Sequence, residues 1–131
     1  MNIVGQFVAA MDTTFNLGTP GQDIFIGGAP KRAPKRCWWV TSGGGSIEQK
    51  LRTGETFKNY VIDVYYRSDS DRDVYDKLQS FEDQLNSAGC VQIAGYDTID
   101  IEAVLFPTDR DLDDEDRTVG LLQVRVRTYK E

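Results

Sequence analysis

The sequence predicts a single α+β domain, in which two helices pack on one face of a mainly antiparallel sheet of about five strands. The chain has 131 residues, the length of one domain. Its apolar residues repeat every three to four positions in two segments and every second position in several others. Most of the strand segments are neighbours in sequence, which favours hairpins. The predicted order is α-β-β-β-α-β-β, without internal repeats or a second domain.

Two segments have the apolar stripe of a helix that packs on a core. The first covers residues 2–16, with Gly18 and Pro20 as its expected stop. The second follows Ser70, an N-cap residue with Asp73 three positions later, and ends at Gly89. The stripes comprise Ile3, Val4, Phe7, Val8, Met11 and Phe15 in the first helix, and Val74, Leu78, Phe81 and Leu85 in the second.

Alternating or β-branched residues predict five strands. They cover residues 23–26, 37–40, 57–67, 96–106 and 119–129. A polar, glycine-rich stretch separates the second strand from the third, and connections of this length inside a small domain are usually functional or mobile. We therefore expect a mobile arm at about residues 43–55.

Charge is concentrated in two segments of a chain whose formal net charge is −6. A basic loop at residues 31–36 carries +4, and an acidic run at residues 109–117 holds six acids and two arginines. This run lies in a charged loop expected at about residues 107–117. The acidic balance argues against nucleic-acid binding over the whole surface. The residues predicted to contact another subunit or partner are Lys31, Arg32, Lys35, Arg36, Trp38, Trp39, Asp109, Asp111, Asp113, Asp114, Glu115, Asp116 and Arg117.

The acidic run begins like a calcium loop, because Asp109, Asp111 and Asp113 match its first three ligand positions. The sixth position needs glycine and is Asp114, and the twelfth needs glutamate and is Gly120. We therefore predict no metal site. Two interpretations stay open, a solvated loop and a contact with a basic protein surface that relieves repulsion between the acids.

Adjacent tryptophans at positions 38 and 39 must point to opposite faces of a strand. One can lie in the core, whereas the other sits on the second face, where large aromatic side chains often anchor interfaces. Core-plus-surface packing without a partner is the alternative.

Catalytic and cofactor-binding residues are not predicted. The chain has no histidine, and no serine or cysteine lies in a nucleophile motif. The triple glycine at residues 43–45 lacks the lysine and hydroxyl residue of a phosphate loop. Cys37 and Cys90 are expected to be free thiols in a reducing compartment. Because no signal peptide or membrane-length apolar run is evident, we expect a soluble protein with no membrane partner.

Several segments together resemble the minor capsid or tail-terminator proteins of long-tailed bacteriophages and prophages. They are residues 24–30 (IFIGGAP), 38–40 (WWV), 60–67 (YVIDVYYR), 74–78 (VYDKL), 113–117 (DDEDR) and 123–126 (QVRV). The resemblance follows element order and length over nearly the whole chain, and none of its motifs is a catalytic signature.

This resemblance implies an α+β subunit of a six-membered ring that sits on the last layer of the tail tube, stops its growth and faces the head-side connector. It implies no cofactor and no reaction. The expected partners are other copies of the chain, the tail tube protein and a connector or stopper protein, in a virion made in the bacterial cytoplasm. The alternatives are another head-tail connector or tube-like subunit and a module that binds a host protein.

Overall fold

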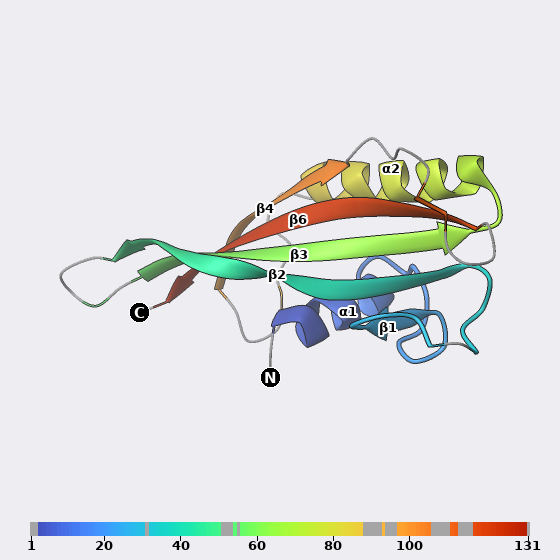
Figure 1. Ribbon diagram of the computed structural model, residues 1–131. Helices are drawn as coiled ribbons and strands as arrows, with labels where there is room; N and C mark the ends of the chain where they lie inside the picture. Colours follow the sequence, from blue (N-terminus) through green and yellow to red (C-terminus); the bar gives the residue numbers. More distant parts are fainter. Residues whose placement is uncertain are drawn as a thin grey trace.

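The computed structural model describes residues 3–30, 32–50, 54, 56–87, 93, 97–105, 111–112 and 117–130. Of these, residues 45–50, 97–100, 104–105, 111–112 and 130 are described by their backbone only. The predicted fold class is confirmed: two helices pack against a sheet in the order β1-β2-β3-β6-β4, and a short β5 pairs with β6 (Figure 1). Every strand pair is antiparallel except β1 with β2.

The element bounds agree with the periodicity of the sequence. The helices are α1 (Ile3–Thr13) and α2 (Asp71–Ser87). The strands are β1 (Ile24–Ile26), β2 (Cys37–Lys50), β3 (Thr56–Ser68), β4 (Asp97–Leu105), β5 (Asp111–Leu112) and β6 (Thr118–Lys130). Neither helix is long and apolar enough to cross a membrane.

Both helices cover the same face of the sheet, as the two apolar stripes predict. Their buried residues join the even-numbered residues of β3 and β6 in one core. Phe81 lies at the junction, with ring centroids 6.1 Å from Phe7 and 5.7 Å from Trp38. The other sheet face carries the odd-numbered residues of these strands, most of which are half-buried.

Strand β2 is longer than the sequence predicts. Residues 43–50, which were expected to begin a mobile arm, continue β2 and pair with β3 as far as Lys50 opposite Thr56. Two register shifts, at Ser42/Gly44 and Ile47/Gln49, accommodate the extra residues. Glycines lower β-propensity, but here the long partner strand decides the structure. The rest of the expected arm lies outside the described residues, apart from Gly54.

Two of the glycines are needed at the first shift. A Cβ atom on Gly43 would lie 2.8 Å from Cγ1 of Val61, and Gly44 has a φ of +102°. The glycine run that we read as a flexible connection therefore forms a β-bulge in which β2 packs tightly against β3.

The helix ends also differ in detail from the prediction. Helix α1 ends at Thr13, and Asn16, with φ of 54°, takes the left-handed conformation in place of Gly18. Helix α2 begins as predicted, because the Ser70 hydroxyl accepts a hydrogen bond from the Asp73 amide at 3.4 Å. Gly89 lies outside the described residues.

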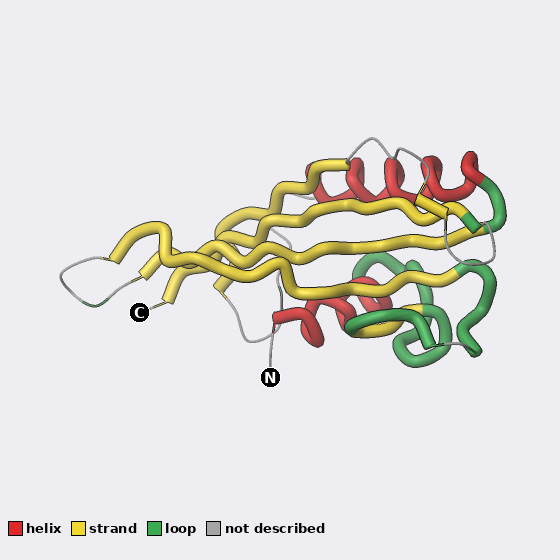
Figure 2. The backbone as a smooth tube through the Cα atoms, viewed as in Figure 1, coloured by secondary structure: helices red, strands yellow, loops and turns green. Residues whose placement is uncertain are grey.

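The sheet has two parts (Figures 1 and 2). In the helix-covered part, α1 and α2 lie against one face. Beyond it, β2, β3 and β6 continue as a ribbon past both helices, to the left in Figure 1. We call this ribbon, with the first half of β4, the extended end; it comprises residues 42–50, 56–61, 97–101 and 125–130. Its inner residues Tyr60, Ile101 and Val126 still contact the core.

Candidate functional site

The basic loop leads directly into β2 and is held by a buried arginine. Arg67 of β3, only 8% exposed, donates Nη2 to the carbonyl oxygen of Pro34 at 2.7 Å and Nε to that of Lys35 at 3.4 Å. Lys35 and Arg36 are exposed. Arg67 thus fixes the backbone that carries these exposed cations.

Earlier in the loop, Arg32 is exposed, and Lys31 lies outside the described residues. Arg32, Pro34 and Phe25 help to line a half-open pocket of about 350 Å³. The rest of its lining is Gly21, Gln22, Pro30 and Ala33.

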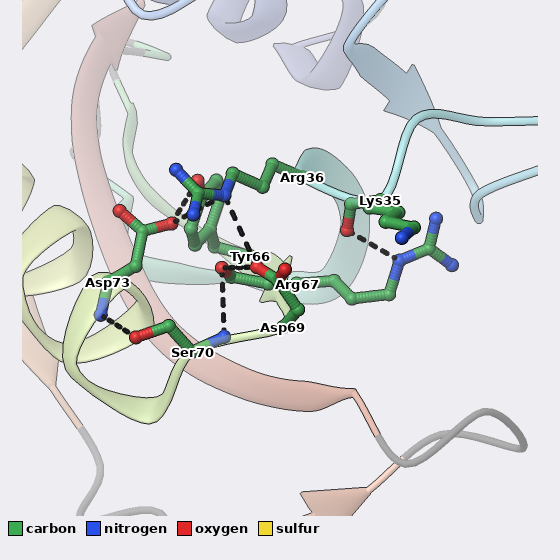
Figure 3. Close-up of polar contacts among 8 residues, drawn as sticks. Lys35, Arg36, Tyr66, Arg67, Asp69, Ser70 and Asp73 are labelled. Carbon is green, nitrogen blue, oxygen red and sulfur yellow. Dashed lines mark hydrogen bonds and ion pairs between the residues drawn. The ribbon is translucent and has the colours of Figure 1, made fainter.

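Arg36 joins the basic loop to the start of α2 (Figure 3). Its Nε atom lies 3.4 Å from Asp69 and 3.7 Å from Asp73, and Asp73 accepts a hydrogen bond from the Tyr66 hydroxyl at 2.8 Å. A backbone hydrogen bond, the Ser68 hydroxyl and Arg36 lower the pKa of Asp69. Burial and the bond to Asp73 raise the pKa of Tyr66 well above its ordinary value.

The two tryptophans lie on opposite faces, as their adjacency predicts. Trp38 is 3% exposed and packs in the core, 4.5 Å from the ring of Tyr66. Trp39 is half-buried on the open face, stacked on Tyr65 at 5.4 Å with Arg67 5.9 Å above its ring. Trp38 is thus a core residue in this chain, which leaves Trp39 as the tryptophan available for a contact.

The acidic run lies mostly outside the described residues, including Asp109, Asp113, Asp114, Glu115 and Asp116. Its backbone at Asp111 belongs to β5, and Arg117 is half-buried just before β6. The strand register shows where β5 lies relative to the basic loop. Cys37, at the start of β2, lies opposite Arg67 of β3; Arg67 lies opposite Val119 of β6, and Val119 lies opposite Asp111 of β5. The basic loop and the acidic run therefore leave the same end of the sheet.

We call this end, comprising residues 32–36, 69–73 and 117, together with the backbone of β5, the charged rim. Strands lie about 4.8 Å apart, so β2 and β5 are separated by roughly 14 Å across the sheet. Sequence reasoning identified both charged segments but could not place them together, because their pairing depends on β3 between them. Arg67 was not among the predicted site residues; its signal in the sequence is a cation directly after the aromatic pair Tyr65 and Tyr66.

A second group of aromatic and cationic side chains lies at the extended end. Phe57 and Tyr129 are cross-strand partners with ring centroids 5.4 Å apart, and the Arg127 guanidinium lies 5.5 Å over the Phe57 ring. On the other face, Lys58 lies 4.7 Å over the Tyr60 ring. These pairs add contacts between side chains at the extended end.

Cys37 is buried and in no disulfide, as predicted, whereas Cys90 lies outside the described residues. The site residues bring together charge, hydrogen-bonding groups and aromatic surface. Such groups are of the kind that protein-protein contacts use.

A family model described as bacteriophage tail terminator protein matches residues 13–130. No curated protein matches the chain. Because the match covers nearly all of the sequence, the chain belongs to the bacteriophage tail terminator family, a family of structural tail proteins.

Proposed function

We propose that this tail terminator forms a hexameric ring on the last layer of the tail tube, ends tube polymerisation and joins the tail to the head-side connector. The family match over residues 13–130 carries the proposal, since it spans α2 and all strands of the sheet. Its partners would be other copies of itself, the tube protein and a connector or stopper protein. The role is structural, with no reaction and no cofactor, in a virion neck assembled from subunits made in the bacterial cytoplasm.

The charged rim supports a ring. A cyclic ring needs a heterologous contact, in which one patch meets a different patch of the neighbour. The basic loop enters β2, and the acidic run leads into β6, two strands away on the same end of the sheet. Neighbours placed side by side in the same orientation would then bring the basic loop of one next to the acidic run of the other.

In this proposal, Arg32 and Lys35 face the acids of the next subunit, with Trp39 near the seam. Arg36 is already shared with Asp69 and Asp73, so it holds the loop rather than the neighbour. Exposed ion pairs contribute only about 0.2–1 kcal/mol each. The rim charges therefore set orientation and partner choice, and they supply little of the affinity.

The rim is tested by charge reversal. The Arg32→Glu/Lys35→Glu double variant should lose rings, or form them far more slowly, by size-exclusion chromatography with light scattering. Lys77→Glu is a control with a single charge reversal, because Lys77 is an exposed cation on α2 one turn beyond the rim residue Asp73. Raising salt from about 0.05 M to about 1 M should slow assembly of the wild type by screening the same charges. Equal assembly of both variants, without salt dependence, would remove the rim from the contact.

A tube-like or connector subunit is the second candidate, and the extended end favours it, since long antiparallel strands suit a subunit that continues a tube. Electron microscopy of the protein alone and with tube protein separates the possibilities. A terminator gives rings and caps tubes at one layer, whereas a tube subunit polymerises into long tubes. A protein that remains monomeric under both conditions would instead support a host-binding module.

A further inference from the structure

The two parts of the sheet differ in how their outer edges are closed. In the helix-covered part, β1 pairs with β2 from Trp38 to Val40 and closes that edge. At the opposite edge, Asn86 of α2 accepts from the Ala103 amide at 2.9 Å and donates to the Ala103 carbonyl at 3.1 Å. One side chain thus takes the place of a neighbouring strand on β4.

At the extended end, the outer edge of β2 is open. The Trp38 amide donates to the Asp23 carbonyl at 2.8 Å, so even-numbered residues of β2 direct their backbone groups outward as far as Ser42. Trp38 lies opposite Tyr66. Because Trp38 directs its backbone groups away from β3, this pair is not hydrogen-bonded, and the even-numbered residues of β3 direct their backbone groups toward β6. Strand β3 pairs with β6 without a register shift. Gly45 and Ile47 lie opposite Tyr60 and Lys58, and their backbone groups also point outward.

The first half of β4 is open in the same way. Ala103 lies opposite Val124, and Asn86 shows that its backbone groups point away from β6. The same alternation directs the groups of Ile101 and Thr98 outward, because they face Val126 and Thr128. Among the described residues, no strand lies beside β2 after Val40 or beside the outer edge of β4.

Open strand edges pair readily with another strand, and folded proteins usually protect them with lysine, proline or a short strand. Residues 41–47 of β2 read TSGGGSI, with neither lysine nor proline, and residues 42–44 are exposed. The two edges are also compatible. β2 and β4 run in opposite directions in the sheet, so the β4 edge of one copy meets the β2 edge of an identically oriented copy antiparallel.

The spacing of the outward residues agrees as well. Ser42 and Gly45 flank one register shift in β2, and Thr98 and Ile101 flank one in β4. Both pairs are three positions apart. Ser42 can therefore lie opposite Ile101 while Gly45 lies opposite Thr98.

We propose that copies of this chain join edge to edge at the extended end, with β2 of one copy hydrogen-bonded to β4 of the next. This contact is heterologous, so it repeats around a ring and extends the sheet from subunit to subunit. This edge pairing rests on the proposed ring and is its principal contact. The charged rim orients the same neighbours. Asn86 and β1 confine the pairing to the extended end by closing both edges elsewhere.

The Gly45→Pro variant tests the contact, with Gly45→Ala as its control. Proline removes only an outward amide and is tolerated on edge strands, whereas alanine keeps the amide. Gly45 is not among the glycines with positive φ, so neither substitution meets a left-handed backbone. With tube protein present, Gly45→Ala should form rings like the wild type. Gly45→Pro should keep the wild-type circular dichroism spectrum but have the native mass of a monomer. Rings of Gly45→Pro at the wild-type level would overturn the edge pairing.

Backbone amide exchange in the wild-type ring gives an independent answer if Gly45→Pro fails to fold. The outward amides of Gly45, Ile47, Thr98 and Ile101 should exchange at least about 100-fold more slowly than in an unfolded chain. The inward Ser46 amide serves as an internal standard, since it opposes Asn59 in the β2–β3 ladder. Fast exchange at the outward amides would overturn the proposal. A wild type that forms no ring would instead refute the proposed function, which separates the two failures.

Discussion

The helix-covered part and the extended end belong to one sheet but are stabilised by different means. In the helix-covered part, two helices bury one face, β1 and Asn86 close the edges, and Arg67 secures the loop at the rim. In the extended end, half-buried side chains form aromatic and cationic pairs, two of them between β3 and β6 and one within β3. The comparison indicates that the first part makes the fold, and in the proposed ring the second gains stability from a neighbour.

The largest expected loss of stability comes from a substitution in the helix-covered part. Phe81→Ala should lower the free energy of unfolding by about 3–5 kcal/mol, because Phe81 is fully buried where both helices meet Trp38. Phe57→Ala at the extended end should cost about 1 kcal/mol, since that ring is half-buried. Urea unfolding of the monomeric protein measures both. Equal losses of unfolding free energy in the two variants would contradict this difference between the two parts of the sheet.

The second effect loosens the charged rim. Arg67→Met should cost about 1.5–3 kcal/mol, because two backbone carbonyls lose a charged donor while an apolar chain of similar length remains. Arg125→Met is the control. Its exposed guanidinium lies as far as 4.0 Å from Glu102, so the ion pair is weak and the loss of unfolding free energy should stay within about 0.5 kcal/mol. Thermal unfolding distinguishes them, and a neutral Arg67→Met would show that the loop needs no such anchor.

The third effect opens the protected edge of β4. Asn86→Ala removes two hydrogen bonds to Ala103 and should cost about 1–2 kcal/mol. Gln84→Ala, an exposed neighbour whose amide lies 3.5 Å from Ser80, should have almost no effect. Amide exchange should also become faster at Ala103 in the Asn86 variant. Unchanged exchange there would mean that Asn86 does not close this edge.

The smallest effect is a pH dependence at the rim. The pKa of Tyr66 is raised in the folded protein, so its contribution to stability is complete below the unfolded-state pKa of about 10 and is lost as the pH rises above it. Tyr66→Phe should cost about 1 kcal/mol at neutral pH and reduce the loss of stability above pH 10. Unfolding curves from about pH 7 to 11 test this, and an unchanged alkaline slope would contradict it.

The elements with a clear apolar period were predictable from the sequence. The alternation at residues 60–66 and the stripe from Val74 to Leu85 gave β3 and α2 to within a residue or two of their observed starts. The second half of β2 was not predictable, because glycines 43–45 favour a loop until β3 is present as a partner. The same limit applied to the site. Charged residues are visible in the sequence, but only strand pairing brings them together at the rim. Arg67 and Asn86 could not be identified, because their hydrogen-bond partners are backbone groups that only the fold places beside them.

The central claim is that this chain assembles head to tail into a closed ring at the end of the tail tube. Native mass spectrometry of the purified protein mixed with its tube protein tests it most directly. The account predicts a single discrete species, a hexamer of this chain, either free or seated on one end of the tube. A continuous series of growing polymers, or a monomer that leaves the tube uncapped, would contradict it.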